Sequence, residues 1–136
     1  MAQSGQYNVS RCRRHGEEAA ARLACCEFVN HTLAMLFLLN ERHMPFYKWA
    51  FRAMRELEKL SELADTFEFL ISSDNEPVTA SAKADIVEDI ASMIITELQN
   101  QGLTDAICGD LEKHAYSVND KISSTQLRTM HIMAGV

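Results

Sequence analysis

The sequence is poor in the two residues that most often interrupt helices, with five glycines and two prolines among 136 residues. Turns depend on these residues, so a chain with so few of them is expected to be mainly helical. Three functional motifs are missing as well: the dinucleotide fingerprint GxGxxG, the phosphate loop GxxxxGK[ST] and the nucleophile elbow GxSxG. No alternating apolar and polar run is long enough to indicate a strand. The pattern therefore predicts an all-α fold.

Long apolar runs are also missing from the chain. The longest, LAMLFLL at residues 33–39, has seven residues, whereas a helix that crosses a bilayer needs roughly 18–20 apolar residues. The N-terminal stretch MAQSGQYNVSRCRRHGEEAAAR carries charges where a secretion signal has its apolar segment. We therefore expect no membrane partner and a cytoplasmic location.

The sequence also lacks clustered metal ligands and catalytic constellations. No histidine pair has the spacing HxxxH and no cysteine pair has the spacing CxxC. Cys25 and Cys26 are neighbours within a helical pattern, which favours reduced thiols over disulfides. Asp85, Glu88 and Asp89 could hold a cation, but acidic residues in a first helical turn more commonly balance the helix dipole. The sequence thus predicts neither a catalytic residue nor a metal site.

The net charge of −6 is divided unevenly along the chain. Residues 1–60 hold nine Lys and Arg against six Asp and Glu, giving +3, while residues 61–136 hold four against thirteen, giving −9. Such an asymmetry indicates that an anionic ligand would meet the N-terminal half. The acidic half would repel nucleic acid, so we expect no nucleic-acid partner.

Apolar residues recur at helical spacing along most of the chain. A first helix, capped by Ser10, is predicted from Arg11 to Asn40. Pro45 is expected in the first turn of the next helix. Ser61 could cap a separate third helix, which would break this one. Its predicted seam consists of Phe46, Ala50, Ala53, Leu57, Leu60, Ala64, Phe67 and Ile71.

The C-terminal half predicts two long helices after a loop at residues 72–80. The first presents Ile86, Ile90, Met93, Ile94 and Leu98 and ends at Gly102, and the second starts at Thr104 and presents Ile107, Leu111, Ala115, Val118 and Ile122. A short helical turn is expected over residues 125–133. The sum is one domain, residues 1–136, that forms an up-and-down bundle of four to five helices. In it, residues 1–9 are a flexible segment and the loop at 72–80 separates the two halves of the bundle.

Aromatic and cationic residues are concentrated at the predicted corner between the first two helices. The candidates for substrate or partner binding are His43, Tyr47, Lys48, Trp49, Arg52 and Arg55. Lys48, Arg52 and Arg55 are spaced by four and three residues and so share one strip of a helix. They could hold a phosphate or carboxylate beside an aromatic face. Alternatively, Trp49 and Phe51 are ordinary core residues, and the cations pair with Glu41, Glu56 or Glu58.

Several stretches are similar to a known family: QYN at 6–8, RCRRHGEEAAA at 11–21, NERHMPFYKWAFRAMREL at 40–57, LEKHAYSVNDKIS at 111–123 and LRTMHI at 127–132. They resemble the C-terminal helical domain, of unknown function, found in uncharacterised nucleotidyltransferase-like proteins. The core P-x-Y-K-W is the specific part of the resemblance. His43 and Phe46 stand where the family pattern has tyrosines, and His15-Gly16-Glu17 stands where a Gly-Asp is commoner.

The resemblance implies an organisation like that of kanamycin-type nucleotidyltransferases. There, a separate catalytic domain with a Gly-Ser and a paired-aspartate motif binds magnesium and a nucleoside triphosphate. This chain has no Gly-Ser dipeptide and no Asp-x-Asp, so it is expected to hold no cofactor and not to be catalytic on its own. It would serve as the substrate-binding or accessory domain, with the catalytic domain or subunit as its partner.

A stand-alone helical interaction or scaffolding module, which could form a homodimer, is the alternative. The two hypotheses differ in what they predict for Lys48 and Arg52. A substrate-binding domain would expose both cations beside a cleft. An interaction module would present an apolar patch and pair both cations internally.

Overall fold

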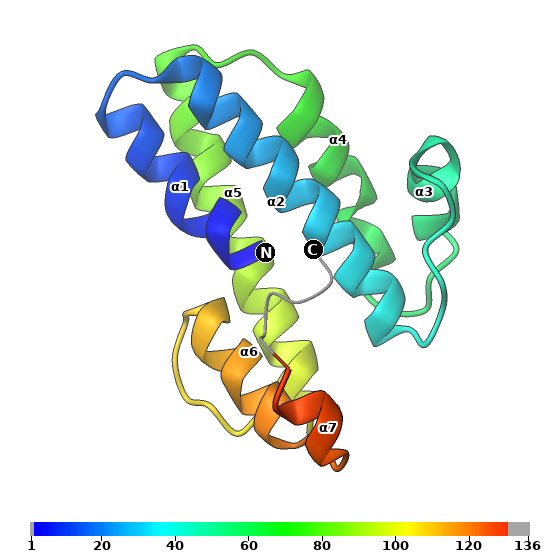
Figure 1. Cartoon of the computed structure of the whole chain (residues 1–136). Helices are drawn as coiled ribbons and strands as arrows, with labels where there is room; N and C mark the ends of the chain where they lie inside the picture. The colour runs from blue at the N-terminus through cyan, green and yellow to red at the C-terminus, as the bar shows by residue number, and fades with distance from the viewer. Residues whose placement is uncertain (1, 131–136) are drawn as a thin grey trace. The chain divides into compact units, whose positions relative to one another are not determined.

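The computed structural model describes residues 2–130, and within them every regular element is helical (Figure 1). The prediction of an all-α fold is therefore confirmed. The helices are α1 (Ala2–Arg14), α2 (Glu18–Leu39), α3 (Tyr47–Met54), the 3-10 turn η1 (Ser61–Leu63), α4 (Ala64–Ser72), α5 (Pro77–Asn100), α6 (Leu111–Asp120) and α7 (Thr125–Arg128). The described part thus has more α-helices than the predicted four to five. One reason is that a turn at Gly16 divides the first expected helix and residues 55–60 divide the second.

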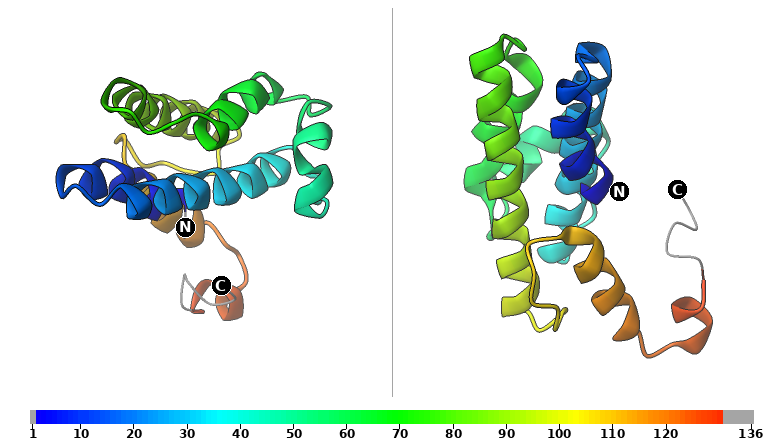
Figure 2. Two further views of the ribbon diagram at one scale, coloured as in Figure 1. Left: turned by 90° about the horizontal axis from the view of Figure 1, so that it is seen from above. Right: turned by 90° about the vertical axis from the view of Figure 1, so that its left-hand side faces the viewer.

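The chain divides into two compact units, one up to Ile90 and one from Ala91 on. The prediction of a single domain stays a prediction. In the first unit, α1 and α2 lie side by side in one layer, and α4 and the first part of α5 form a second layer (Figure 2). The division between the units falls within α5, not at the loop where the sequence predicted two halves of a bundle to separate.

The N-terminal residues are helical, which corrects two predictions. Residues 2–9 belong to α1 instead of a flexible segment, and the helix expected from Arg11 to Asn40 is broken at Gly16. Gly16 has φ of 72°, a conformation that glycine adopts without steric cost. The Gly16 N–H donates to the Arg13 carbonyl at 2.9 Å, and the Glu17 N–H donates to the Cys12 carbonyl at 3.0 Å. These two bonds are the Schellman motif that ends a helix.

A close approach between Gly5 and Phe28 explains why α1 is held against α2. Any Cβ at position 5 would overlap the backbone and Cβ of Phe28, which is fully buried. Ala2 and Val9 are buried on the same helix. Burial of this face, which is formed by small residues, stabilises α1. The polar composition of the segment had not indicated that it would form a packed helix.

The second half of α2, which contains the apolar run at residues 33–39, is largely buried. Leu33, Leu36 and Phe37 are buried, whereas Leu38 is 72% exposed. By length and mean hydropathy (1.3), α2 could cross a membrane, but half of the relevant window is buried inside the protein. A helix in the core of a globular protein can have the same length and mean hydropathy, so these two properties alone are weak evidence for a membrane span.

The seam predicted over residues 46–71 is interrupted, and its two ends lie outside the core. Ala50, Leu57, Ala64 and Phe67 are buried, as expected for the inner part of the seam. Its outermost members, Phe46 and Ile71, are 67% and 43% exposed, and Ala53 and Leu60 are partly exposed. Helix α3 begins two residues after Pro45 and ends at Met54. The chain then turns through Leu60, with φ of 61°, into η1 and α4.

The loop predicted over residues 72–80 is shorter than expected. Helix α4 extends to Ser72, and α5 begins at Pro77. Proline suits the first position of a helix because its missing N–H would have no helical partner there. At the other end of α5, Gly102 has φ of 66° and forms a second Schellman motif, which confirms the predicted stop.

In the second unit, the helix predicted from Thr104 begins at Leu111. The side chain of Asp110 caps it by accepting a hydrogen bond from the Glu112 N–H at 2.9 Å. Ile107, a predicted core residue, lies in the preceding loop and is 96% exposed, and Ala115 is exposed as well. Helix α7 covers the first part of the turn expected at 125–133, and residues 131–133 lie outside the described residues.

Candidate functional site

The segment that carries the predicted binding residues is closed at its base by Asn40 and Lys59. The Asn40 Nδ2 donates to the Lys59 carbonyl at 3.1 Å and to the Leu36 carbonyl at 2.8 Å. The Asn40 Oδ1 accepts from the Lys59 N–H at 2.9 Å. Because the side-chain amide pairs with a peptide group in both directions, it fixes both ends of the segment that contains α3.

A left-handed residue follows Asn40 directly. Glu41 has φ of 54°, and the next residue, Arg42, donates its N–H to the Phe37 carbonyl at 2.9 Å. The Glu41 N–H donates to the Leu38 carbonyl at 2.9 Å. This third Schellman motif ends α2 and turns the chain towards α3, and it does so with a glutamate where glycine is the usual residue.

The aromatic residues at the start of α3 lie on the protein surface. Phe46, Tyr47 and Trp49 are all at least half exposed. The rings of Phe46 and Tyr47 are 4.4 Å apart between centroids and tilted by 47°. The hypothesis that Trp49 is an ordinary core residue is therefore wrong, whereas Phe51 is partly buried and Ala50, the residue after Trp49, is fully buried.

Two cations lie against the ring of Trp49. The Lys48 Nζ is 5.3 Å and the Arg52 Cζ is 5.4 Å from the ring centroid, both within the range of cation–π attraction. Both side chains are exposed, and neither has an ion-pair partner among residues 2–130. We name Phe46, Tyr47, Lys48, Trp49 and Arg52 the α3 patch.

Arg55, the third cation of the predicted strip, has a different environment. Its Nη2 is 2.8 Å from both Glu68 Oε1 and Asp65 Oδ1, and these bonds, that of Glu68 first, raise the pKa of the guanidinium above its ordinary value. The pairing expected for the cations was with Glu41, Glu56 or Glu58, and Arg55 instead uses two carboxylates of α4. Arg55 therefore ties α3 to α4 and is not part of the α3 patch.

His43 lies in the connection between α2 and α3 and is exposed. It follows Arg42, whose guanidinium donates to the Glu56 carbonyl at 3.4 Å. No hydrogen bond or ion pair of His43 is found among the described residues. Four of the predicted residues, Tyr47, Lys48, Trp49 and Arg52, therefore belong to the α3 patch. His43 lies in the connection that precedes it.

A surface depression lies between α3 and α4, on the side of α3 that carries Phe51. It has a volume of about 370 Å³ and is lined by Phe51, Glu68, Ile71 and Ser72. Lys48 precedes the lining residue Phe51 by one helical turn, and the lining residue Glu68 is paired with Arg55. Sequence reasoning missed this feature, because nothing in the sequence shows that Phe51 and Ile71 would face each other.

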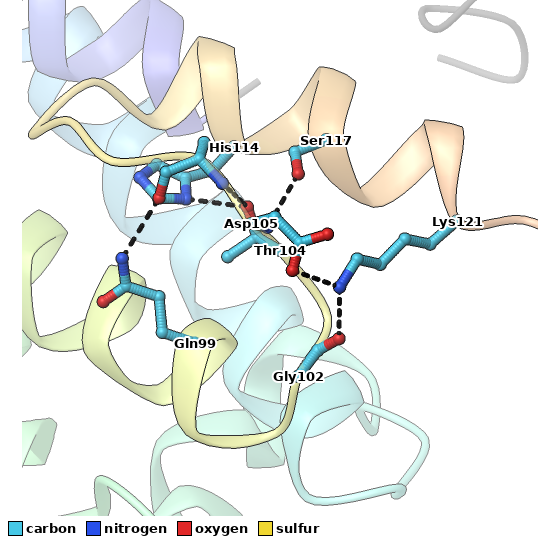
Figure 3. Close-up of polar contacts among 8 residues, drawn as sticks. Gln99, Gly102, Thr104, Asp105, His114, Ser117 and Lys121 are labelled. Atoms are coloured by element: carbon cyan, nitrogen blue, oxygen red, sulfur yellow. Dashed lines mark hydrogen bonds and ion pairs between the residues drawn. The ribbon is translucent and has the colours of Figure 1, made fainter.

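A polar network in the second unit was also missed (Figure 3). The fully buried His114 contacts Thr104 Oγ1 through Nδ1 at 3.0 Å and the Cys108 carbonyl through Nε2 at 2.9 Å. A carbonyl only accepts hydrogen bonds, so Nε2 is the donor in its bond to Cys108. Both ring nitrogens are used in holding the loop before α6, which makes His114 a structural residue.

Nucleophilic and metal chemistry find little support in the rest of the described chain. All four cysteines are free thiols. Burial raises the pKa of the Cys25 thiol, which lowers its thiolate fraction. No group of three His, Cys, Asp or Glu close enough to hold a metal ion occurs within residues 2–130.

Comparison with known proteins gives one match. Residues 1–50 match the family model described as a Domain of unknown function (DUF4037). The match covers α1, α2 and the first half of α3, including Lys48 and Trp49. No curated protein and no solved structure matches the chain. Over its first 50 residues, this chain is thus similar to a family whose function is not known.

Proposed function

We propose that this chain is the helical substrate-binding or accessory part of a nucleotidyltransferase, and that the α3 patch is its contact with an anionic group of the substrate or of the catalytic partner. The proposal rests on the resemblance of the stretch around P-F-Y-K-W and on the chemistry of this patch. The single observation that supports it most is that Lys48 and Arg52 are exposed and lack ion-pair partners within residues 2–130.

The patch has the chemistry of a phosphate- or carboxylate-binding surface. Lys48 supplies a point charge, and the planar guanidinium of Arg52 can donate two parallel hydrogen bonds to one oxyanion. The ring of Trp49 lies against both cations and offers an aromatic surface for a ring or a sugar. Binding and orientation are the steps that these residues can perform. Magnesium and the nucleoside triphosphate would be bound by the separate catalytic domain, since this chain has no Asp-x-Asp.

The two hypotheses drawn from the sequence have opposite expectations for Lys48 and Arg52. Internal pairing, expected of a stand-alone interaction module, is found for Arg55. Exposure beside a concave surface, expected of a substrate-binding domain, describes Lys48, which lies one turn from the depression at Phe51. The exposed rings of Phe46 and Tyr47 favour the second candidate, an interaction module, because exposed aromatic residues are common at the centres of protein interfaces.

Two experiments test the proposal in order. The first is to read the coding region that precedes Met1 for a Gly-Ser followed about ten residues later by Asp-x-Asp. If such a segment is encoded there, the second experiment measures binding of that protein to this chain by isothermal titration calorimetry. The double variant Lys48→Ala/Arg52→Ala should weaken binding on the order of tenfold or more without changing the melting temperature.

Lys113→Ala is the matched control, because Lys113 is also an exposed helical lysine but lies on α6. It should bind like the unchanged protein. Unchanged binding by the double variant would contradict the role of the α3 patch. Absence of any catalytic segment in the neighbouring genes would instead favour the interaction module.

A further inference from the structure

A small cavity lies in the first unit, where the turn between α1 and α2 meets the loop between α4 and α5. Figure 1 shows this turn and this loop at the same end of the unit. The cavity has a volume of about 10 Å³, which is enough for one particle the size of a water molecule. Its polar lining consists of Arg13 from α1, Cys25 from α2, Asn75 from the loop and Lys83 from α5, and the rest of the described lining is aliphatic.

Lys83 places a positive charge at this cavity, although its side chain is only 4% exposed. Its Nζ donates to the Ser73 carbonyl at 3.0 Å and to Asn75 Oδ1 at 3.1 Å, and both of these oxygens are uncharged. Lys83 forms no ion pair within residues 2–130, and the carboxylate of Asp74 is exposed. Because an ammonium group has three N–H donors, these two bonds leave one donor unused.

The other polar groups of the lining supply a second cation. The guanidinium of Arg13 donates to the Pro77 carbonyl at 3.4 Å, which uses one of its five N–H donors. The Cys25 thiol donates to a backbone carbonyl, and burial raises its pKa, so it stays protonated near neutral pH. The Asn75 amide donates to Glu18 at 3.4 Å, so this carboxylate is bonded to the amide and not to either cation. The described lining thus contains two positive charges and no carboxylate.

A buried charge is normally paired, because an uncompensated charge in a low-dielectric interior costs free energy. Helix α4 ends at Ser72, so its carbonyl end offsets part of the charge of Lys83. However, α2 and α5 both begin beside the cavity, since the lining residues Ala21 and Ala80 belong to their first turns. The positive ends of these two helix dipoles add to the field of the two cations.

We propose that this cavity binds one small monovalent anion of halide size, held by the Nζ of Lys83 and the guanidinium of Arg13. A water molecule also has room here, but it brings no negative charge to the buried ammonium group. A phosphate or a carboxylate is too large for the volume. The bound anion links α1 to α5, so it stabilises the first unit. The site shares no residue with the α3 patch and is independent of the proposed function.

Thermal unfolding of the full chain, with chloride exchanged for gluconate at constant ionic strength, tests this site. Gluconate does not fit the cavity, so the melting temperature should rise with the chloride concentration and then level off, by about 2–8 °C in total. Lys83→Met removes the charge but keeps a long side chain, and it should abolish the chloride dependence. Lys113→Met, at an exposed lysine of α6, is the matched control and should keep it.

A second variant and a direct binding measurement decide the question even if Lys83→Met does not fold. Arg13 is only half-buried, and Arg13→Gln should need several-fold more chloride for half of the rise in melting temperature. Chloride binding should also broaden the chlorine NMR signal of the unchanged protein. Arg13→Gln should reduce this broadening, whereas the α3-patch variant Lys48→Ala/Arg52→Ala should retain it.

Three results would overturn the proposal. The first is an equal melting temperature of the unchanged protein in the two salts. The second is a rise with chloride that does not level off, which would be a general salt effect. The third is a chloride dependence that Lys83→Met or Arg13→Gln leaves unchanged. Each of them would assign the cavity to a water molecule.

Discussion

The side-chain amide of Asn40 and the peptide groups of Lys59 pair in both directions, at 2.9 and 3.1 Å, across 19 positions of the sequence. In helices and sheets, a peptide group bonds to other peptide groups. Here the side chain of Asn40 takes that role for the N–H and the carbonyl of Lys59. Asn40 thus closes the base of the α3 segment, together with the weaker bonds from Arg42 to the Glu56 carbonyl at 3.4 Å and from the Lys59 Nζ to the Leu39 carbonyl at 3.5 Å.

Replacing Asn40 by alanine should open this closure. The change leaves the N–H and carbonyl of Lys59 and the carbonyl of Leu36 without this partner in a part-buried position, at a cost of about 1–3 kcal/mol in the free energy of unfolding. Hydrogen exchange should also rise within α3. Asn30→Ala, on the exposed side of α2, is the control and should change neither quantity much. Unchanged exchange in α3 would show that Arg55 and its partners hold the segment without Asn40.

Replacing Glu41 by glycine should stabilise the protein. A left-handed conformation costs a non-glycine residue roughly 1–2 kcal/mol, which exceeds the added unfolded-chain entropy of glycine. The expected gain is about 0.5–1 kcal/mol, measured by urea unfolding. The reverse change at the equivalent position of α5, Gly102→Ala, should destabilise by a similar amount, because Gly102 has φ of 66°. A loss of stability in Glu41→Gly would mean that the glutamate side chain contributes more than its backbone strain costs.

Replacing Gly5 by alanine should destabilise the protein, although alanine favours helices. The new methyl group would overlap the backbone of Phe28, which cannot move without displacing α2. We expect a net loss of about 1–3 kcal/mol in thermal or chemical unfolding. Gly109→Ala is the control, because a Cβ there meets no atom within 4 Å. Equal stability of Gly5→Ala and the unchanged protein would argue against the close contact between α1 and α2.

Asp74 should contribute to the loss of stability in acid. Hydrogen bonds from the Glu76 N–H and from Thr79 lower the pKa of its carboxyl below the ordinary value of 3.8. A carboxyl whose pKa is lower in the folded state stabilises the fold above its unfolded pKa, and the contribution is lost as pH falls through the folded pKa. Unfolding curves measured from pH 5 down to pH 2 should therefore fall less steeply for Asp74→Asn. Identical slopes for the two proteins would contradict this assignment.

Local signals in the sequence were enough for some elements and not for others. Gly102 was correctly read as a helix end because it follows a long apolar periodicity, whereas Gly16 lies among charged residues that gave no such contrast. Threonine and aspartate are both common capping residues, so the sequence alone does not distinguish Thr104, the predicted cap, from Asp110. In the structure, Thr104 is hydrogen-bonded to the buried His114, and Asp110 caps α6. Phe46 fitted the seam by spacing but lies at its outer end, where no helix covers it.

The candidate site shows the same division. The members of the α3 patch are neighbours in sequence, so their chemistry could be recognised from a short stretch. The depression at Phe51 and Ile71 joins residues of two helices, and the pairing of Arg55 with Asp65 and Glu68 depends on how α4 returns to α3. Those contacts follow from tertiary packing, which spacing along the chain does not encode.

Trp49 is the only tryptophan of the chain, and it is half exposed on the patch proposed to bind an anion. The ultraviolet emission of the whole protein therefore comes mainly from this one surface. With two cations against its indole ring, that emission should respond when a ligand displaces either of them. The molecule thus carries its own optical reporter, and candidate substrates can be screened in solution without attaching a label.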